Sequence, residues 1–377
     1  MTVIGYGASD KKADLAPVRF ERPAIRPGEV SFDVLYCGVC HSDVHQCHDD
    51  WGNTVWPCVP GHEIVGRVTE VGDGVTRFAA GDLVGVGCMV NSCQTCDACQ
   101  AGEEQYCTGP RGATLTYNGP TDPDGTNTYG GYSTALTVRE EFCLTIPDAI
   151  DPTHAGPILC AGITTYHPLK YHDVGPGMEV AIAGIGGLGH MAIQIAKALG
   201  ARVTALTTSP SKADPVKELG ADDVLVMDDE DAVADAEGRF DLILSTIPYA
   251  HDVNPYVSMV AHDGTLHFVG LFMPVEELET MDILFKRKAL MGSLIGGVAQ
   301  TQEVLEFCAE HDIRPEIEII SIAQVNDAFQ RVKDEDVRFR HVIDMATLHE
   351  VAGTIEAEAI DPPVRGLPED GGDAPAA

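Results

Sequence analysis

The segment MEVAIAGIGGLGHMAIQIAKALG, residues 178–200, joins an apolar run to a glycine-rich turn and an amphipathic stretch. The apolar run predicts a buried strand, and the apolar spacing after the turn predicts a helix. Glycines between a strand and a helix permit a tight turn and close approach of a ligand, while the helix N-terminus faces a pyrophosphate. This placement favours a dinucleotide site over a glycine-rich turn without a ligand. The turn consists of Gly184, Ile185, Gly186, Gly187, Leu188 and Gly189.

The surrounding sequence, residues 158–296, alternates between strands and helices. Six strands with crossover segments predict an α/β fold with a doubly wound parallel sheet. The expected strands are Met178–Ala183, Arg202–Leu206, Val224–Val226, Phe240–Ser245, Thr265–Gly270 and Leu290–Ile295.

The flanking regions have different patterns. Residues 1–157 contain short apolar runs broken by Gly, Pro and Asp, which predicts an irregular β-rich domain. Residues 297–346 contain a helical stretch and one further strand, Arg340–Met345. The remainder is rich in Ala, Gly, Pro and acids, so we expect residues 347–377 to form an acidic tail that is solvated or loosely helical.

The composition narrows the classes of function. The 377 residues include 58 Asp and Glu against 24 Lys and Arg, a formal net charge of −34. Such a surface repels phosphate backbones and anionic lipid, so we expect neither nucleic acid nor membrane as a partner. No membrane-length apolar run or signal peptide is visible, which favours the cytoplasm. The acid excess predicts halophilic adaptation to a salt-rich cytoplasm, and a mildly acidic protein from an ordinary cytoplasm is the alternative.

Four of the twelve cysteines lie in one short segment, NSCQTCDACQAGEEQYC. The spacing Cys93-x2-Cys96-x2-Cys99-x7-Cys107 lets four thiolates close a tetrahedral shell around one ion. A ferredoxin cluster has three residues before its last cysteine and a proline after it, whereas this segment has seven residues and Thr108. The pattern therefore predicts a closed, structural zinc site that supports folding.

A second possible ligand set is dispersed along the chain. Cys40 lies in CGVCHSDVH, His62 in PGHE and Cys160 in PILCAG. Two cysteines and one histidine are ligands of a catalytic zinc that keeps its fourth position open. Each residue also has an ordinary interpretation, as a small buried side chain or a satisfied core histidine. Spacing does not decide between these interpretations, because the three residues lie far apart in sequence.

The end of the second expected strand indicates which dinucleotide binds. An NAD site normally has a carboxylate there for the ribose 2′-hydroxyl. This chain instead has Thr207, Thr208, Ser209 and Lys212, in ALTTSPSK. Hydroxyls with a cation suit a 2′-phosphate and therefore predict NADP(H), whereas an ordinary polar loop is the alternative.

Together these motifs resemble the zinc-dependent medium-chain dehydrogenase/reductase superfamily, and within it the cinnamyl-alcohol-dehydrogenase-like branch of broad-range aldehyde reductases. The GHE motif continues as GHE-x2-G-x5-G from Gly61 to Gly72, and the CGVCHSD element, the four-cysteine loop and the glycine turn occur in the family's order. The resemblance covers residues 1–346. It implies a GroES-like catalytic domain, residues 1–157 and 297–346, a Rossmann domain, residues 158–296, and an active site in the cleft between them.

By position, the resemblance assigns Cys40, His62 and Cys160 as catalytic zinc ligands. Glu63 matches the adjacent carboxylate, which can act as an alternate ligand. The implied coenzyme contacts are Thr164, the turn residues Gly184, Gly186, Gly187, Leu188 and Gly189, and Thr207, Thr208, Ser209, Lys212, Thr246, Val269, Ser293, Ile295 and Arg340.

The resemblance implies an alcohol dehydrogenase or aldehyde reductase of broad specificity, which transfers hydride between NADP(H) and a primary alcohol or aldehyde. It also implies two Zn²⁺ per chain, a homodimer, and a proton relay formed by Ser42 and His45. Trp51 and Trp56 either line an aromatic-tolerant pocket or belong to the packed core.

Three other classes of protein share parts of this pattern. A zinc-free, quinone-reductase-like member would lack the set of Cys40, His62 and Cys160, which this chain retains. A non-catalytic module of the same fold would lose Ser42 or a zinc ligand. An electron carrier with iron in the four-cysteine loop would absorb visible light.

Overall fold

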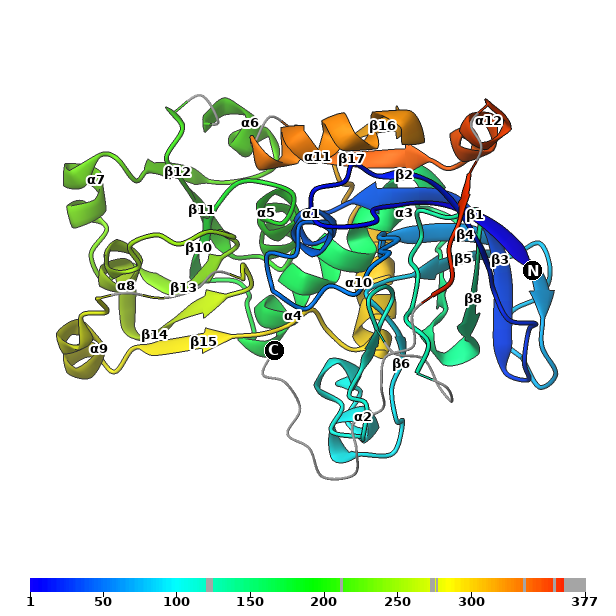
Figure 1. Cartoon of the computed structure of the whole chain (residues 1–377). Helices are drawn as coiled ribbons and strands as arrows, with labels where there is room; N and C mark the ends of the chain where they lie inside the picture. The colour runs from blue at the N-terminus through cyan, green and yellow to red at the C-terminus, as the bar shows by residue number, and fades with distance from the viewer. Residues whose placement is uncertain are drawn as a thin grey trace. The chain divides into compact units, whose positions relative to one another are not determined.

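The computed structural model describes residues 1–119, 125–210, 213–271, 275, 277–334, 337–354 and 357–362. The chain divides into two compact units, whose elements are labelled in Figure 1. Unit 1 comprises Met1–Cys160, Gly297–Glu306 and Glu316–Ala377, and unit 2 comprises Ala161–Gly296 and Phe307–Pro315.

Unit 2 contains a six-stranded parallel sheet in the order β12-β11-β10-β13-β14-β15. This order, which starts in the middle and extends first to one edge and then to the other, confirms the predicted doubly wound sheet. The strands are β10 (Glu179–Ala183), β11 (Arg202–Thr207), β12 (Asp223–Val226), β13 (Phe240–Ser245), β14 (Val260–Phe268) and β15 (Ala289–Gly292). The helices are α4 (Ile163–Tyr171), α5 (Gly189–Ala198), α6 (Ala213–Glu218), α7 (Glu230–Asp235), α8 (Asn254–Met259) and α9 (Thr280–Lys286).

Two strands of unit 2 differ from their predicted bounds by more than one residue. β14 begins at Val260, five residues before the predicted start, because Val260 already pairs with Phe240 ahead of an irregularity in the ladder. β15 ends at Gly292, before the predicted end at Ile295, because Ile295 has a φ of 40° and leaves the extended region.

Unit 1 contains a seven-stranded sheet in which β16-β17-β3-β4-β5-β9 follow one another and β8 also pairs with β3. A three-stranded sheet, β1-β2-β18, and a two-stranded sheet, β6-β7, complete its described strands. Their bounds are β1 (Thr2–Gly7), β2 (Ala16–Glu21), β3 (Glu29–Val39), β4 (Ile64–Val71), β5 (Leu83–Val86), β6 (Met89–Asn91), β7 (Thr114–Leu115), β8 (Ala135–Arg139), β9 (Leu144–Thr145), β16 (Ile317–Ser321), β17 (Arg340–Asp344) and β18 (Glu358–Ala359). This β-rich unit confirms the predicted β-rich domain.

The helices of unit 1 are short and lie between these strands in the sequence. They are α1 (His41–Cys47), α2 (Asp97–Gln100), α3 (Pro152–Pro157), α11 (Val325–Lys333), α12 (Ala346–Thr354) and the 3₁₀ turns η1 (Glu104–Tyr106), η2 (Glu140–Phe142) and η5 (Ile322–Gln324). The π-helical turn η3 (Ile158–Gly162) and helix α10 (Val298–Glu310) each include residues of both units. No described helix has the length and apolar character that crossing a bilayer requires.

The first part of the expected acidic tail contains regular structure. It includes most of α12, and β18 pairs in parallel with β2, so this part of the chain contributes a strand to unit 1. Residues 363–377 of the expected tail lie outside the described residues.

Candidate active site and structural metal site

Four side chains of unit 1 gather although 120 residues separate Cys40 from Cys160. The ligand atoms of Cys40, His62, Glu63 and Cys160 all lie within 4.8 Å of one another, and all four residues are buried. The two sulfurs are 3.9 Å apart, and His62 Nε2 lies 3.2 Å from Cys160 Sγ. Zn–S bonds of about 2.3 Å in a tetrahedron place two sulfurs about 3.8 Å apart. The group therefore fits a zinc ion.

Neighbouring strand ends bring these ligands together. β3 ends directly before Cys40, and β4, its antiparallel partner, begins directly after Glu63. Cys160 lies in the π-helical turn η3, a type of distortion that is frequent at functional sites. The Cys160 thiol lowers the pKa of Cys40 well below its usual range, as do the charges of Arg340 and His62 to a smaller extent. This shift favours the thiolate, which is the form that binds metal.

Asp43, which our sequence analysis did not select, holds two of the ligands. Its Oδ2 accepts the backbone N–H of Cys40 at 2.9 Å, and its Oδ1 accepts the backbone N–H of Gly61 at 3.0 Å. Asp43 Oδ1 also lies 3.0 Å from His62 Nδ1. When His62 Nδ1 carries the proton, its Nε2 offers a lone pair toward the thiols. The signal for Asp43 was its place three residues after Cys40, where an acid caps the start of helix α1.

Glu63 is fully buried and ion-paired with Arg340, the first residue of β17, at 3.1 Å. Burial raises the pKa of Glu63 to about 8, although Arg340 opposes this shift. Glu63 Oε1 is the oxygen of this ion pair, and Oε2 accepts no hydrogen bond from the described residues. The position also explains Gly38, since a Cβ there would collide with Glu63 Oε2.

The predicted relay residues Ser42 and His45 both lie on α1. His45 Nδ1 is 2.7 Å from Oδ2 of the exposed Asp50, and its Nε2 is buried without a hydrogen-bonding partner among the described residues. Asp50 is a second residue that sequence reasoning missed. Trp51 is 37% exposed and its ring centroid lies 5.6 Å from that of His45, while Trp56 is half-buried. Neither tryptophan belongs to the fully buried core.

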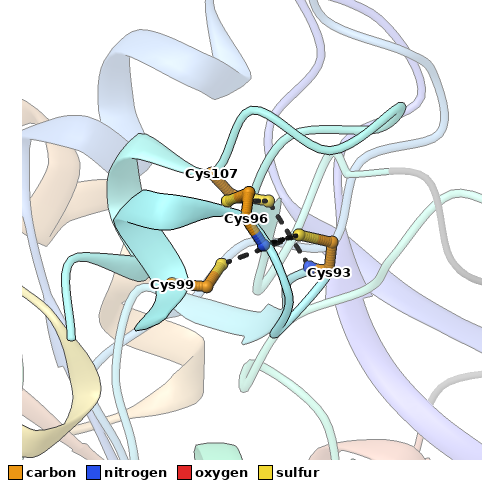
Figure 2. A group of neighbouring side chains, drawn as sticks. All are labelled: Cys93, Cys96, Cys99 and Cys107. Atoms are coloured by element: carbon orange, nitrogen blue, oxygen red, sulfur yellow. Dashed lines mark hydrogen bonds between the residues drawn. The ribbon is translucent and has the colours of Figure 1, made fainter. Parts of the chain in front are cut away.

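The four-cysteine loop forms a second, separate ligand group. Figure 2 shows the side chains of Cys93, Cys96, Cys99 and Cys107 converging on one point. Cys93 Sγ lies 3.9 Å from Cys99 Sγ, and Cys96 Sγ lies 4.0 Å from Cys107 Sγ, again close to the separation in a zinc tetrahedron. Backbone N–H groups of Cys99 and Thr108 lower the pKa of Cys96 to about 5.

The loop that carries these cysteines is connected to α10. Glu104, which is buried, accepts the backbone N–H of Val298 at 3.0 Å through its carboxylate Oε2. A Cβ at Gly297 would collide with the carbonyl oxygen of Gly102. The loop that carries the four thiols is therefore held to the start of α10 by Glu104.

The glycine turn of unit 2 has the features of a dinucleotide cradle. Gly184 has a φ of 84°, and Thr246 Oγ1 donates to the Gly184 carbonyl at 2.8 Å. A Cβ at Gly189 would collide with that carbonyl, whereas a Cβ at Gly186 would meet no atom within 4 Å. The backbone at Gly186 is therefore open to a ligand, and helix α5 begins at Gly189.

The other predicted coenzyme contacts are distributed unevenly. Thr207 ends β11 and its Oγ1 accepts the Ser209 backbone N–H at 3.1 Å, while Thr208 is exposed; Lys212 lies outside the described residues. At one edge of the sheet, the carboxyl ends of β13, β14 and β15 are followed by Thr246, Val269, Ser293 and Ile295. Thr164 is buried in α4. Arg340 belongs to unit 1, where it pairs with Glu63.

Comparison with known proteins identifies the family. The alcohol dehydrogenase GroES-like domain matches residues 26–148, and the zinc-binding dehydrogenase domain matches residues 187–310. NADP-dependent alcohol dehydrogenase C 1 of Mycolicibacterium smegmatis is 48% identical over 347 residues, which cover 92% of this chain and 99% of the relative. The chain belongs to the zinc-binding medium-chain dehydrogenases.

Other members of these dehydrogenases agree in sequence and in structure. Aldehyde reductase YahK of Escherichia coli is 46% identical over 350 residues, covering 92% of this chain and 99% of the relative. The structure of a Sorghum bicolor cinnamyl alcohol dehydrogenase matches with a TM-score of 0.88 at 40% identity, covering 92% of this chain and 98% of the other. The structure of the Helicobacter pylori enzyme CAD, complexed with NADP(H), matches with a TM-score of 0.86 at 36% identity, covering 92% and 99%. These likenesses support alcohol dehydrogenase or aldehyde reductase activity with zinc and NADP(H) as cofactors.

Proposed function

We propose that this dehydrogenase interconverts aldehydes and primary alcohols with broad specificity, using NADP(H). The observation that carries the proposal is the buried group of Cys40, His62 and Cys160, with Glu63 beside it. It is the ligand chemistry of a catalytic zinc site, and the relatives' names supply the substrate and coenzyme classes.

The residues of unit 1 would hold the metal and keep its ligands in place. When bound, zinc supplies a Lewis acid for the substrate oxygen and NADPH supplies the hydride. Cys40, Cys160 and His62 Nε2 provide three ligands, and Asp43 fixes the His62 ring. Arg340 balances the charge of the buried Glu63, which is positioned to act as an alternate ligand.

Two residues of helix α1, Ser42 and His45, would transfer the proton that aldehyde reduction consumes. Ser42 donates its hydroxyl proton to the new alcohol oxygen, and His45 restores that proton. Asp50, which is exposed and hydrogen-bonded to His45 Nδ1, connects the imidazole with solvent. In alcohol oxidation the proton leaves by the reverse route.

A panel of aliphatic, benzylic and cinnamyl aldehydes tests the proposed activity, with NADPH consumption as the signal. We expect turnover with several members of the panel and none with the Cys160→Ser variant. If the wild-type protein with both metal sites loaded reduces none of these aldehydes and oxidises none of the matching alcohols, the proposed activity is wrong.

The partner in solution is proposed to be a second copy of this chain. β15 is an edge strand of the unit 2 sheet, and Leu290 on it is partly exposed. Beside it, Met281, Leu284 and Phe285 on α9 are 69–81% exposed. Pairing of two β15 edges about a twofold axis would cover both the strand edges and these side chains. Phe285→Glu should convert a dimer to a monomer in sedimentation, and a wild-type monomer would contradict the pairing.

The proposal also extends to domain roles and location. We assign residues 1–157 and 297–346 to a catalytic domain and residues 158–296 to a coenzyme domain. The net charge of −34 supports a location in a salt-rich cytoplasm, where screening weakens the repulsion between surface acids.

A further inference from the structure

Three side chains of unit 2 form a hydrogen-bonded chain that the mechanism above does not use. His172 Nε2 lies 3.0 Å from His267 Nδ1, and His267 Nε2 lies 2.9 Å from Ser293 Oγ. His172 directly follows α4 and is half-buried, whereas His267 lies in β14 and is only 1% exposed. These hydrogen bonds therefore lead from the surface of unit 2 to Ser293, which directly follows β15.

His267 occupies a place where an apolar side chain would satisfy the fold. Its register partners in the sheet are Leu244 and Met291, and its neighbour Leu266 packs into an apolar cluster on the opposite face of the sheet. Burying an imidazole costs stability unless its nitrogens find partners. Both nitrogens of His267 have one, so the histidine is built into a complete chain of hydrogen bonds.

The far end of this chain lies at the ligand edge of the sheet. In a doubly wound sheet the dinucleotide crosses the carboxyl ends of the strands, with one mononucleotide on each half. The glycine turn and β11 belong to the half that takes the adenosine side, and β13, β14 and β15 form the other half. Ser293, at the carboxyl end of β15, therefore lies on the half that takes the nicotinamide side. Its backbone is fixed by a hydrogen bond from its N–H to the Phe268 carbonyl at 3.2 Å.

The chain constrains how the Ser293 hydroxyl can point. Burial, and then the nearby His172 and His167, lower the pKa of His267 to about 4, so the ring is neutral near pH 7. A neutral imidazole has one N–H and one lone pair. With Nδ1 engaged by His172, Nε2 either donates to Ser293 Oγ or accepts from it. In both cases His267 occupies one hydrogen-bonding position of the Ser293 hydroxyl. The other position of that hydroxyl, its O–H or a lone pair, is left for a ligand.

We propose that His267, held by His172, is a positioning residue that orients the Ser293 hydroxyl toward the nicotinamide half of the coenzyme. The proposal rests on the proposed function, because it takes Ser293 as a coenzyme contact. It concerns the half that NADPH and NADH share, so it is independent of the preference for NADPH.

Binding of two ligands tests the proposal. Titration calorimetry with NADPH and with 2′-phospho-ADP-ribose, which lacks the nicotinamide, is carried out on the full chain and its variants. Ser293→Ala and His267→Leu should each weaken NADPH binding about three- to tenfold, the effect of one hydrogen bond, and leave 2′-phospho-ADP-ribose unchanged. Because His267 acts through Ser293, the double variant should bind NADPH no more weakly than Ser293→Ala.

Two further variants separate positioning from stability. Leu266→Ala removes a buried side chain next to His267 on the opposite face, so it should lower the unfolding midpoint and leave NADPH affinity unchanged. His172→Phe changes the half-buried end of the chain, so it remains testable if His267→Leu fails to fold; it should weaken NADPH binding but not 2′-phospho-ADP-ribose binding.

Several results would overturn the proposed positioning of Ser293 by His267 and His172. If Ser293→Ala weakens NADPH binding while His267→Leu and His172→Phe do not, the two histidines have only a structural role. Equal weakening of both ligands would indicate general damage to the unit. If Ser293→Ala binds NADPH like the wild type and still reduces aldehydes, the positioning role of His267 is wrong and the proposed function stands. A wild type that binds only NADH is tested in the same way with NADH and ADP-ribose.

Discussion

Asp43 Oδ1 lies 3.0 Å from His62 Nδ1, and the same side chain accepts the backbone N–H groups of Cys40 and Gly61. One buried carboxylate thus fixes two of the proposed zinc ligands and the turn that precedes the second. Such partners of metal ligands set the histidine tautomer and ring orientation.

Replacing Asp43 with Asn should therefore weaken the catalytic metal site. The amide retains the shape but loses the charge that favours an N–H at His62 Nδ1, and we expect a loss of about 10- to 100-fold in zinc affinity or turnover. Zinc retained in graded chelator, together with kcat, measures the effect. Asp49→Asn is the matched control, since Asp49 caps the neighbouring loop by accepting the Thr54 N–H at 2.9 Å. Equal zinc retention in wild type and Asp43→Asn would contradict the role of Asp43.

The four-cysteine loop should contribute to folding and not to chemistry. Cys96→Ser or Cys107→Ser should remove one zinc per chain and lower the unfolding midpoint by roughly 5–10 °C, if the site contributes a few kcal/mol. Cys143→Ser, a buried cysteine outside both ligand groups, should keep both zinc ions. Iron with a visible absorbance, or an unchanged midpoint in the zinc-depleted variants, would show that the structural zinc assignment is wrong.

Coenzyme choice should depend on Lys212, which follows Thr207, Thr208 and Ser209 in the sequence. A charge-assisted contact with the 2′-phosphate contributes roughly 1.5–3 kcal/mol, so Lys212→Ala should weaken NADPH binding about ten- to a hundredfold and leave NADH binding nearly unchanged. Lys217→Ala removes the same charge five residues later in the sequence and should have little effect on either coenzyme. Equal losses for NADPH and NADH in Lys212→Ala would mean that Lys212 does not bind the phosphate.

Salt should stabilise the protein. With 58 acidic and 24 basic side chains, screening relieves repulsion more than it weakens ion pairs such as Lys197–Asp222. The unfolding midpoint should rise steeply between dilute buffer and about 1 M KCl, where the Debye length is about 3 Å, and then level off. An uncharged osmolyte at matched water activity controls for effects other than screening. A midpoint that is highest in dilute buffer would rule out the proposed salt adaptation.

Local patterns predicted the features that depend on neighbouring residues in the chain. The apolar runs of unit 2 revealed its sheet because strands buried on both faces are continuously apolar, and the four-cysteine spacing revealed a ligand group that closes within one loop. The approach of Cys160 to Cys40 depends on tertiary structure, which spacing does not encode. The ion pair of Arg340 with Glu63 could not be predicted either, because it depends on the pairing of β17 with β3; the coenzyme contact that the resemblance implies for Arg340 stays a prediction. The part that Asp43 plays toward His62 appears only once β3 and β4 are paired.

The most direct test of the proposed catalytic zinc is the zinc content of the Cys160→Ser variant, measured with its NADPH-dependent aldehyde turnover and its unfolding midpoint. We expect one zinc per chain fewer than in the wild type, no turnover, and a midpoint close to that of the wild type, because the four-cysteine loop is untouched. A variant that keeps two zinc ions per chain and still reduces aldehydes would show that Cys160 is not a ligand of a catalytic zinc.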